Sequence, residues 1–208
     1  MSSIEPSEIK IKELISLFDK KKFDELLKLS NKLLDNFPKS ILLRNIQGVV
    51  HTELKNYKLA KDLFIKVVNL NPKYTDGYYN LANIFMKLNE EEKAIENYKK
   101  VIELDKNYFK AHNNLGNIYR RKGLNKKAIE YYSSTLEINS NYKVAYYNLA
   151  GVLQFYILNV ENKKINKYLL YLLKEKIIVR PNSIAPNVLK SLFVNTDLKK
   201  NLSLISIR

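Results

Sequence analysis

The sequence contains no cysteine and no tryptophan, and only two histidines, five glycines and five prolines among 208 residues. Without cysteine the chain forms neither a disulfide nor a thiolate metal site, which suits a reducing compartment. The glycines are scattered, so neither of the glycine-rich phosphate-binding motifs occurs, and no H-E-x-x-H metal motif is present. We therefore expect this chain to hold no metal and no cofactor, and to have no enzymatic activity by itself.

Long apolar runs are also missing. No segment approaches the roughly 18 to 20 apolar residues that a membrane-spanning helix needs, and the longest candidate, residues 151–160, is interrupted by Gln154 and Asn159. The first ten residues, MSSIEPSEIK, lack the basic and apolar regions of a secretory signal. We expect no membrane insertion and a cytoplasmic location.

Acidic residues are outnumbered, with 21 Asp and Glu against 36 Lys and Arg, for a net charge of +15. Only five of the basic residues are arginine, and the chain is also rich in Asn and Ile, which share A+T-rich codons with Lys. Genome composition is our preferred explanation for most of the lysines. Residues 143–208 nevertheless hold 11 basic and 3 acidic residues, a net charge of +8, so nucleic acid stays open as a minor alternative partner.

What the sequence does contain is an internal repeat. Residues 75–108 are restated by residues 109–142, and the same frame extends back over residues 41–74 and forward from Lys143. A small residue recurs at the eighth position, alanine at the twentieth, and an aromatic four residues later. These residues are Gly48, Ala82, Gly116 and Ala150; Ala60, Ala94 and Ala128; and Phe64, Tyr98 and Tyr132.

The repeat resembles the tetratricopeptide repeat, a helix–turn–helix unit of the same length. The residues that fill its signature in residues 75–108 are Tyr78, Leu81, Ala82, Phe85, Ala94 and Tyr98. Their spacing places them on one face of each of two helices. The small residues let the two helices approach, and a larger one would destabilise the pair by about 1–3 kcal/mol. The resemblance implies an all-α fold, a right-handed superhelical solenoid of antiparallel helix pairs with a concave groove.

We divide the chain at the repeat boundaries. The segments are residues 7–40, a degenerate N-terminal capping repeat; 41–74, 75–108 and 109–142, three regular repeats; 143–176, a degenerate repeat; and 177–208, C-terminal capping helices. The first segment is called degenerate because Leu14 and Leu26 stand where small residues are expected. Gln47 and His51 also depart from the family pattern. Both histidines, His51 and His112, occupy positions that are normally aromatic, and we expect them to be packing residues.

Asparagine recurs at the same places in successive repeats, on the faces of the first helices that are not used within the helix pair. We call Asn80, Asn83, Asn114, Asn117 and Asn148 the asparagine series. It resembles the asparagine ladder in the tetratricopeptide region of O-linked N-acetylglucosamine transferases, which holds extended peptide backbones. An amide offers a donor and an acceptor, matching a peptide group whatever its side chain. Local solvation and capping are the alternative, since Asn is abundant throughout.

We predict a scaffold or adaptor that binds an extended polypeptide in its groove. The asparagine series would contact the peptide backbone, and side-chain selectivity would come from Tyr79, Lys110, Arg120 and Tyr147. The clamp that other tetratricopeptide domains use for a C-terminal carboxylate is not expected, because only Lys110 supplies a clamp-like lysine.

Two alternatives come from other classes of function. Similar arrays precede transferase domains, so the chain could be the substrate-recruiting arm, stand-alone or truncated, of a glycosyltransferase or sulfotransferase system. A nucleic-acid-binding solenoid would need the basic tail to gather its charge on one surface and to bind in a salt-sensitive way. The lysines concerned are Lys163, Lys164, Lys167 and Lys174. Their alternation with apolar residues favours a solvated helix face instead.

Overall fold

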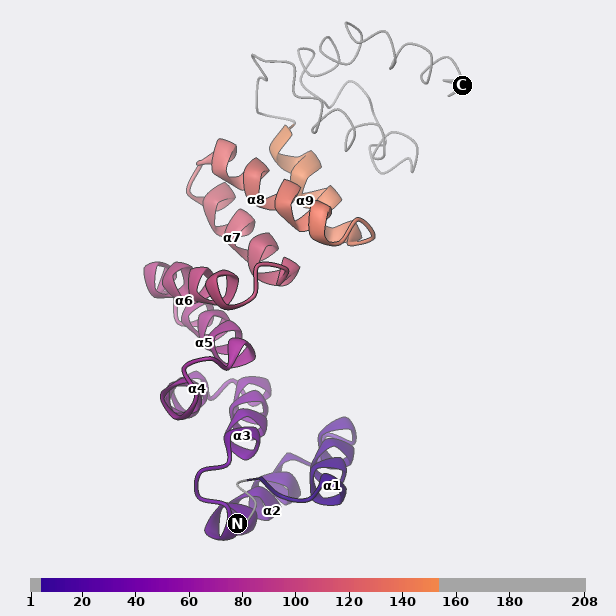
Figure 1. Ribbon diagram of the computed structural model, residues 1–208, viewed down its shortest axis with the longest axis vertical. Helices are drawn as coiled ribbons and strands as arrows, with labels where there is room; N and C mark the ends of the chain where they lie inside the picture. The colour runs from indigo at the N-terminus through magenta and orange to yellow at the C-terminus, as the bar shows by residue number, and fades with distance from the viewer. Residues whose placement is uncertain (1–4, 154–208) are drawn as a thin grey trace, which may run out of the picture. The chain divides into compact units, whose positions relative to one another are not determined.

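The computed structural model describes residues 5–153, which form nine α-helices and no strand (Figure 1). The helices are α1 (Glu8–Asp19), α2 (Phe23–Asn36), α3 (Ile41–Glu53), α4 (Tyr57–Leu70), α5 (Thr75–Lys87), α6 (Glu91–Leu104), α7 (Phe109–Arg121), α8 (Asn125–Ile138) and α9 (Lys143–Leu153). The all-α helical repeat fold expected from the sequence is therefore confirmed. None of these nine helices is both long enough and apolar enough to cross a membrane.

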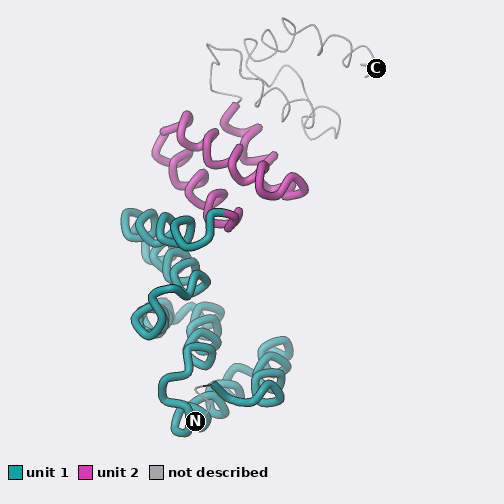
Figure 2. Tube along the Cα trace, in the orientation of Figure 1, with its two compact units in different colours: residues 1–106 teal, residues 107–208 magenta. Residues whose placement is uncertain are grey.

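The chain divides into two compact units, residues 1–106 and residues 107–208 (Figure 2). Unit 1 contains the helix pairs α1–α2, α3–α4 and α5–α6. Unit 2, as far as Leu153, contains the pair α7–α8 and the helix α9, which packs on α8. We refer to α1, α3, α5, α7 and α9 as first helices, and to α2, α4, α6 and α8 as second helices.

The first helix of each described pair ends in the same turn. The fifteenth residue of the repeat has a positive φ angle, and these residues are Lys21 (56°), Lys55 (60°), Asn89 (61°) and Gly123 (71°). A residue in this left-handed conformation stops an α-helix and turns the chain back, and glycine adopts it at the least cost. The turn residues of the first two helix pairs are lysines, so the helical hairpin is imposed there by packing rather than by turn chemistry.

The two helices of a pair approach closely at the eighth position. A Cβ atom added to Gly48 would lie 2.6 Å from Cε1 of Phe64, and one added to Gly116 would lie 2.6 Å from Cε1 of Tyr132. Both rings are almost fully buried. The prediction that small residues permit this close approach is confirmed at both glycines.

Two departures from the repeat pattern have a packing explanation. Leu14 and Leu26 are fully buried together and pack with Leu43, so larger side chains fill the space between α1, α2 and α3. Gln47 is only 5% exposed, and its amide Nε2 donates to Oγ of Ser30 at 2.9 Å and to Oδ1 of Asn31 at 2.7 Å. The polar replacement is tolerated because α2 supplies its hydrogen-bond partners.

The histidines are near-core residues, as predicted. Both are half-buried, and the Nδ1 atom of each ring is inaccessible to solvent. The His112 ring lies 6.0 Å from the ring of Tyr131, and burial lowers the pKa of His51.

Some predictions lie outside the described residues. They are the second helix of residues 143–176, the C-terminal capping helices of residues 177–208, and the surface formed by Lys163, Lys164, Lys167 and Lys174.

Candidate functional site

All nine predicted site residues lie on first helices. In unit 1, α5 carries three of them, and in unit 2, α7 and α9 carry six. The residues are Tyr79, Asn80 and Asn83 on α5; Lys110, Asn114, Asn117 and Arg120 on α7; and Tyr147 and Asn148 on α9. The two groups belong to different units, so each is described by itself.

Two members of the asparagine series join successive repeats. In unit 1, Nδ2 of Asn80 donates to Oδ1 of Asn45 at 2.9 Å, and in unit 2, Nδ2 of Asn148 donates to Oδ1 of Asn113 at 3.0 Å. Asn45 and Asn113 were not in the predicted site, although each precedes its partner by one repeat and one residue. Each pair connects two neighbouring first helices, so these amides have a structural role as well as any binding role.

Two other members bond within their own repeat. Oδ1 of Asn83 accepts a hydrogen bond from the Tyr98 hydroxyl at 2.5 Å, and Oδ1 of Asn117 accepts one from the Tyr132 hydroxyl at 2.8 Å. In the repeat of residues 41–74, Phe64 stands where the tyrosine would be, and the matching position holds Val49 rather than an amide. Across the three repeats of residues 41–142, the amide and the hydroxyl therefore occur together, and apolar residues replace both together.

Burial raises the pKa of Tyr132 to about 12, and the nearby Arg120 and Arg121 act in the opposite direction with smaller effect. The hydroxyl therefore stays protonated at neutral pH and keeps donating to Asn117. This bond directs the amide oxygen of Asn117 towards Tyr132, and the Nδ2 group is the end that can donate to a ligand. Hydrogen bonds within the fold thus occupy part of each amide, which is neither the solvation nor the capping that the sequence left as the alternative.

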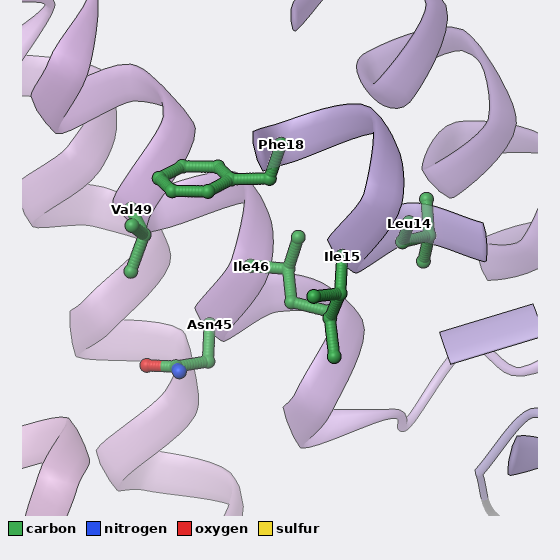
Figure 3. Close-up of a pocket in the computed structure, with 6 residues that line it drawn as sticks. All are labelled: Leu14, Ile15, Phe18, Asn45, Ile46 and Val49. Atoms are coloured by element: carbon green, nitrogen blue, oxygen red, sulfur yellow. The ribbon is translucent and has the colours of Figure 1, made fainter. Parts of the chain in front are cut away.

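Unit 1 also contains an open pocket between α1 and α3, with a volume of about 160 Å³ (Figure 3). Its lining residues are Leu14, Ile15 and Phe18 of α1, and Asn45, Ile46 and Val49 of α3. Five of these six side chains are apolar, and Ile15 is 50% exposed. Asn45 also holds Asn80, so the Asn45–Asn80 amide pair lies at the edge of the pocket.

Sequence reasoning missed this pocket because it treated residues 7–40 only as a cap. The feature of the sequence that points to the pocket is the ninth position of the repeat. This position holds Ile15 in residues 7–40, Val49 in residues 41–74 and Asn83 in residues 75–108. The ninth position, which carries an amide in α5, is therefore apolar in α1 and α3.

The first helices of unit 2 are basic. Lys110 and Arg120 of α7 are exposed, and Tyr147 of α9 is 55% exposed. The Arg120 guanidinium reaches α9, where its Nη1 atom lies 3.4 Å from the position that a Cβ atom on Gly151 would occupy. In unit 1, by contrast, the ring of Tyr79 packs 5.9 Å from the ring of Tyr98. Within residues 5–153, no three His, Cys, Asp or Glu side chains gather as metal ligands.

Comparison with known families identifies the repeat. A family model described as "TPR repeat" matches residues 82–123, and models described as "Tetratricopeptide repeat" match residues 43–74 and 109–142. These matches confirm the tetratricopeptide repeats expected from the sequence. No curated protein sequence matches the chain.

The similar solved structures include the following three. The crystal structure of MamA is 23% identical, with 83% of this chain and 97% of that chain covered and a TM-score of 0.68. YrrB, described as a TPR protein with an unusual peptide-binding site, is 20% identical. The match covers 85% of this chain and 87% of that chain, with a TM-score of 0.61. The first TPR of Spaghetti (RPAP3), bound to an HSP90 peptide, is 26% identical. The match covers 55% of this chain and 91% of that chain, with a TM-score of 0.52. The first two likenesses bear on the fold alone.

Proposed function

We propose that this tetratricopeptide-repeat chain is a scaffold or adaptor that binds an extended polypeptide segment along its first helices. Tetratricopeptide repeats serve in general as interaction modules rather than as enzymes, and two similar structures are described as binding peptides. The observation that carries the proposal is the open apolar pocket of unit 1 with an amide pair at its edge.

The pocket and the amides match the two parts of an extended peptide. Alternate side chains of an extended chain point to opposite sides, so one aliphatic or aromatic side chain enters the pocket lined by Ile15, Phe18 and Val49. Binding pockets of this kind are mostly apolar with a few placed polar groups. The backbone beside that side chain then lies against Asn45 and Asn80, whose remaining amide groups accept and donate hydrogen bonds.

In unit 2 the same role falls to Asn117 and Asn148. Asn113 is only 3% exposed and holds Asn148 through a hydrogen bond. Because Tyr132 holds the amide oxygen of Asn117, this residue would donate to a peptide carbonyl rather than accept from a peptide N–H. Tyr147 adds an exposed ring on α9.

Peptide display with a random library tests this proposal. Random short peptides would be selected on the full chain, and the affinity of each selected peptide would be measured by fluorescence anisotropy. We expect Ile15→Glu or Tyr147→Ala to weaken binding about tenfold or more, because each removes an exposed contact on a first helix. Neither side chain is part of the buried core, so both variants should fold.

The chain offers matched controls. Ile9 lies on the same helix as Ile15 and is 77% exposed but does not line the pocket, and Leu59 is an exposed apolar residue of α4. Ile9→Glu and Leu59→Ala should leave the affinities unchanged. Failure to select any peptide, or binding that tolerates both first-helix variants, would contradict the proposal.

The alternatives drawn from the sequence stay predictions. A transferase link is tested by inspecting the DNA downstream of Arg208 for a continuing or adjacent transferase frame. The nucleic-acid alternative depends on lysines beyond Leu153. The cytoplasmic location likewise stays a prediction, which fractionation of the source cells would test.

A further inference from the structure

We infer that the first helices of unit 2 select acidic side chains, Asp or Glu, in the polypeptide segment that the module binds. This inference rests on the proposed function and names the chemistry of its partner. It begins from the charges of two helices: α7 and α9 contain Lys110, Arg120, Arg121 and Lys143, and neither helix contains an Asp or a Glu.

The lysine-rich composition of the whole chain does not account for this charge. The three first helices of unit 1 contain four basic and five acidic residues, so they are close to neutral. The basic residues are Lys10, Lys12, Arg44 and Lys87, and the acidic ones are Glu8, Glu13, Asp19, Glu53 and Asp76. Among the described first helices, the positive charge is therefore concentrated on those of unit 2.

No acidic residue among those described forms an ion pair with Lys110 or Arg120. Lysines elsewhere in residues 5–153 do pair with carboxylates three or four residues away, on α1, at the start of α2, and on and beside α6. Lys110 and Arg120 are both exposed. Within residues 5–153 no carboxylate neutralises either cation, and a carboxylate is the group complementary to both.

The geometry around Arg120 fits a carboxylate. Arg120 lies over Gly151, and Asn117 lies one helical turn before it on the same face of α7. The guanidinium offers planar, paired N–H donors that match a carboxylate, and such charge-assisted pairs are stronger than neutral hydrogen bonds. The Nδ2 amide of Asn117 can donate to the backbone carbonyl beside the bound acid, because Tyr132 holds its oxygen.

The spacing favours a peptide over a nucleic acid. Lys110 and Arg120 are ten residues apart on one helix, which corresponds to roughly 15 Å along its axis. Amide side chains lie between them at Asn113, Asn114 and Asn117. An extended peptide covers roughly 15 Å in four to five residues, so two acidic residues at that spacing would reach both cations. A nucleic acid, with a phosphate at every nucleotide, would require cations in place of the intervening amides.

The test compares peptides selected by two forms of the full chain. From a random display library, wild-type protein should select peptides enriched in Asp and Glu at two positions four or five apart. The Lys110→Gln/Arg120→Gln double variant should select peptides without this enrichment. Its affinity for the best acidic wild-type peptide should fall about tenfold or more, and replacing the two acids of that peptide by Gln should reproduce the loss in wild-type protein.

The control is a double variant with the same change in net charge, Lys99→Gln/Lys126→Gln, in which both lysines lie on second helices and are exposed. It should bind the acidic peptide within about twofold of wild type. An equal loss in the control would overturn the inference, since the effect would then belong to overall charge. Selection of peptides without acidic enrichment would also overturn it, while leaving the proposed function intact.

Two further outcomes separate the inference from its premise. Selection of no peptide at all would remove the proposed function and the inference together. A labelled single-stranded oligothymidylate serves as the nucleic-acid probe. If it bound in a manner that required Lys110 and Arg120, while selected peptides did not require them, the basic face would be assigned to nucleic acid and the inference would be wrong.

Discussion

Tyr132 and Asn117 show how one residue pair links the core of a repeat to its exposed face. The tyrosine ring fills the space against Gly116, and its hydroxyl reaches Asn117 at 2.8 Å. In the repeat of residues 41–74 the same two positions hold Phe64 and Val49, which need no hydrogen bond. The amide of Asn117 is thus explained in part by the hydroxyl behind it.

This coupling predicts a non-additive pair of substitutions. Tyr132→Phe should lower the free energy of unfolding by about 1 kcal/mol, because one hydrogen bond is lost. Asn117→Val should lower it by about 1–3 kcal/mol, because a buried hydroxyl loses its acceptor. The double variant reproduces the Phe64 and Val49 pair. Its loss of unfolding free energy should be smaller than the sum of the losses in the two single variants. Urea unfolding of the four proteins measures the coupling energy, and strictly additive costs would show that the pair is not coupled.

At the scale of the element, each described helix pair depends on one residue in the left-handed conformation. Lys55 adopts it at a φ of 60° and Gly123 at 71°. A residue with a Cβ atom is strained there by roughly 1–2 kcal/mol, whereas glycine is not. The same turn is therefore less favourable in the α3–α4 pair than in the α7–α8 pair.

Exchanging these residue types should change stability in opposite directions. We expect Lys55→Gly to raise the free energy of unfolding by up to about 1 kcal/mol, since relief of strain exceeds the added entropy of the unfolded chain. Gly123→Ala should lower it by about 1 kcal/mol. Lys66→Gly in the interior of α4 is the control for glycine itself and should be destabilising by about 1 kcal/mol. A destabilising Lys55→Gly would show that the turn is not strained.

For the molecule as a whole, buried ionisable rings limit the pH range of stability. Burial raises the pKa of Tyr132 to about 12 and also raises the pKa values of Tyr74 and Tyr131. Burial lowers the pKa of His51 below its ordinary value of 6.5. In the folded state the tyrosines therefore resist losing a proton, and His51 resists gaining one.

The directions of these pKa shifts predict that the free energy of unfolding is greatest at neutral to mildly alkaline pH. As pH rises above about 10, the unfolded chain loses tyrosine protons that the folded chain keeps, so folding is weakened as the pH approaches the folded value of Tyr132 near 12. As pH falls below about 6.5, the unfolded chain binds a proton at His51 that the folded chain resists. Urea midpoints measured across this range should fall at both ends.

Single substitutions test which residue causes the fall of the urea midpoint at each end of the pH range. Tyr132→Phe should make the fall in stability at alkaline pH less steep, with Tyr74 and Tyr131 still contributing, and His51→Phe should make the fall at acidic pH less steep. A variant whose urea midpoint varied with pH as in wild type would show that its residue does not contribute. Salt should be held constant, because the chain carries a net charge of +15.

The repeat, the all-α class and the residues in the interior of each helix pair can all be predicted from the amino-acid sequence. Helical periodicity and one small residue per hairpin are local features, and each recurs in successive repeats, so a single chain contains several copies of the same evidence. The positions of Gly48 and Gly116 against aromatic rings followed from that pattern. The near-core placement of His51 and His112 followed from it as well.

The partners of the side chains on the first helices, by contrast, depend on the three-dimensional fold. It paired Asn80 with Asn45 and Asn148 with Asn113, and it gave Gln47 its partners on α2. It also opened the apolar pocket between α1 and α3 in a repeat that the sequence marked only as a cap. The physical reason is that a hydrogen bond or a pocket between helices depends on distances of a few ångströms between residues far apart in the chain. The period of the repeat specifies which positions correspond, but not which side chains meet.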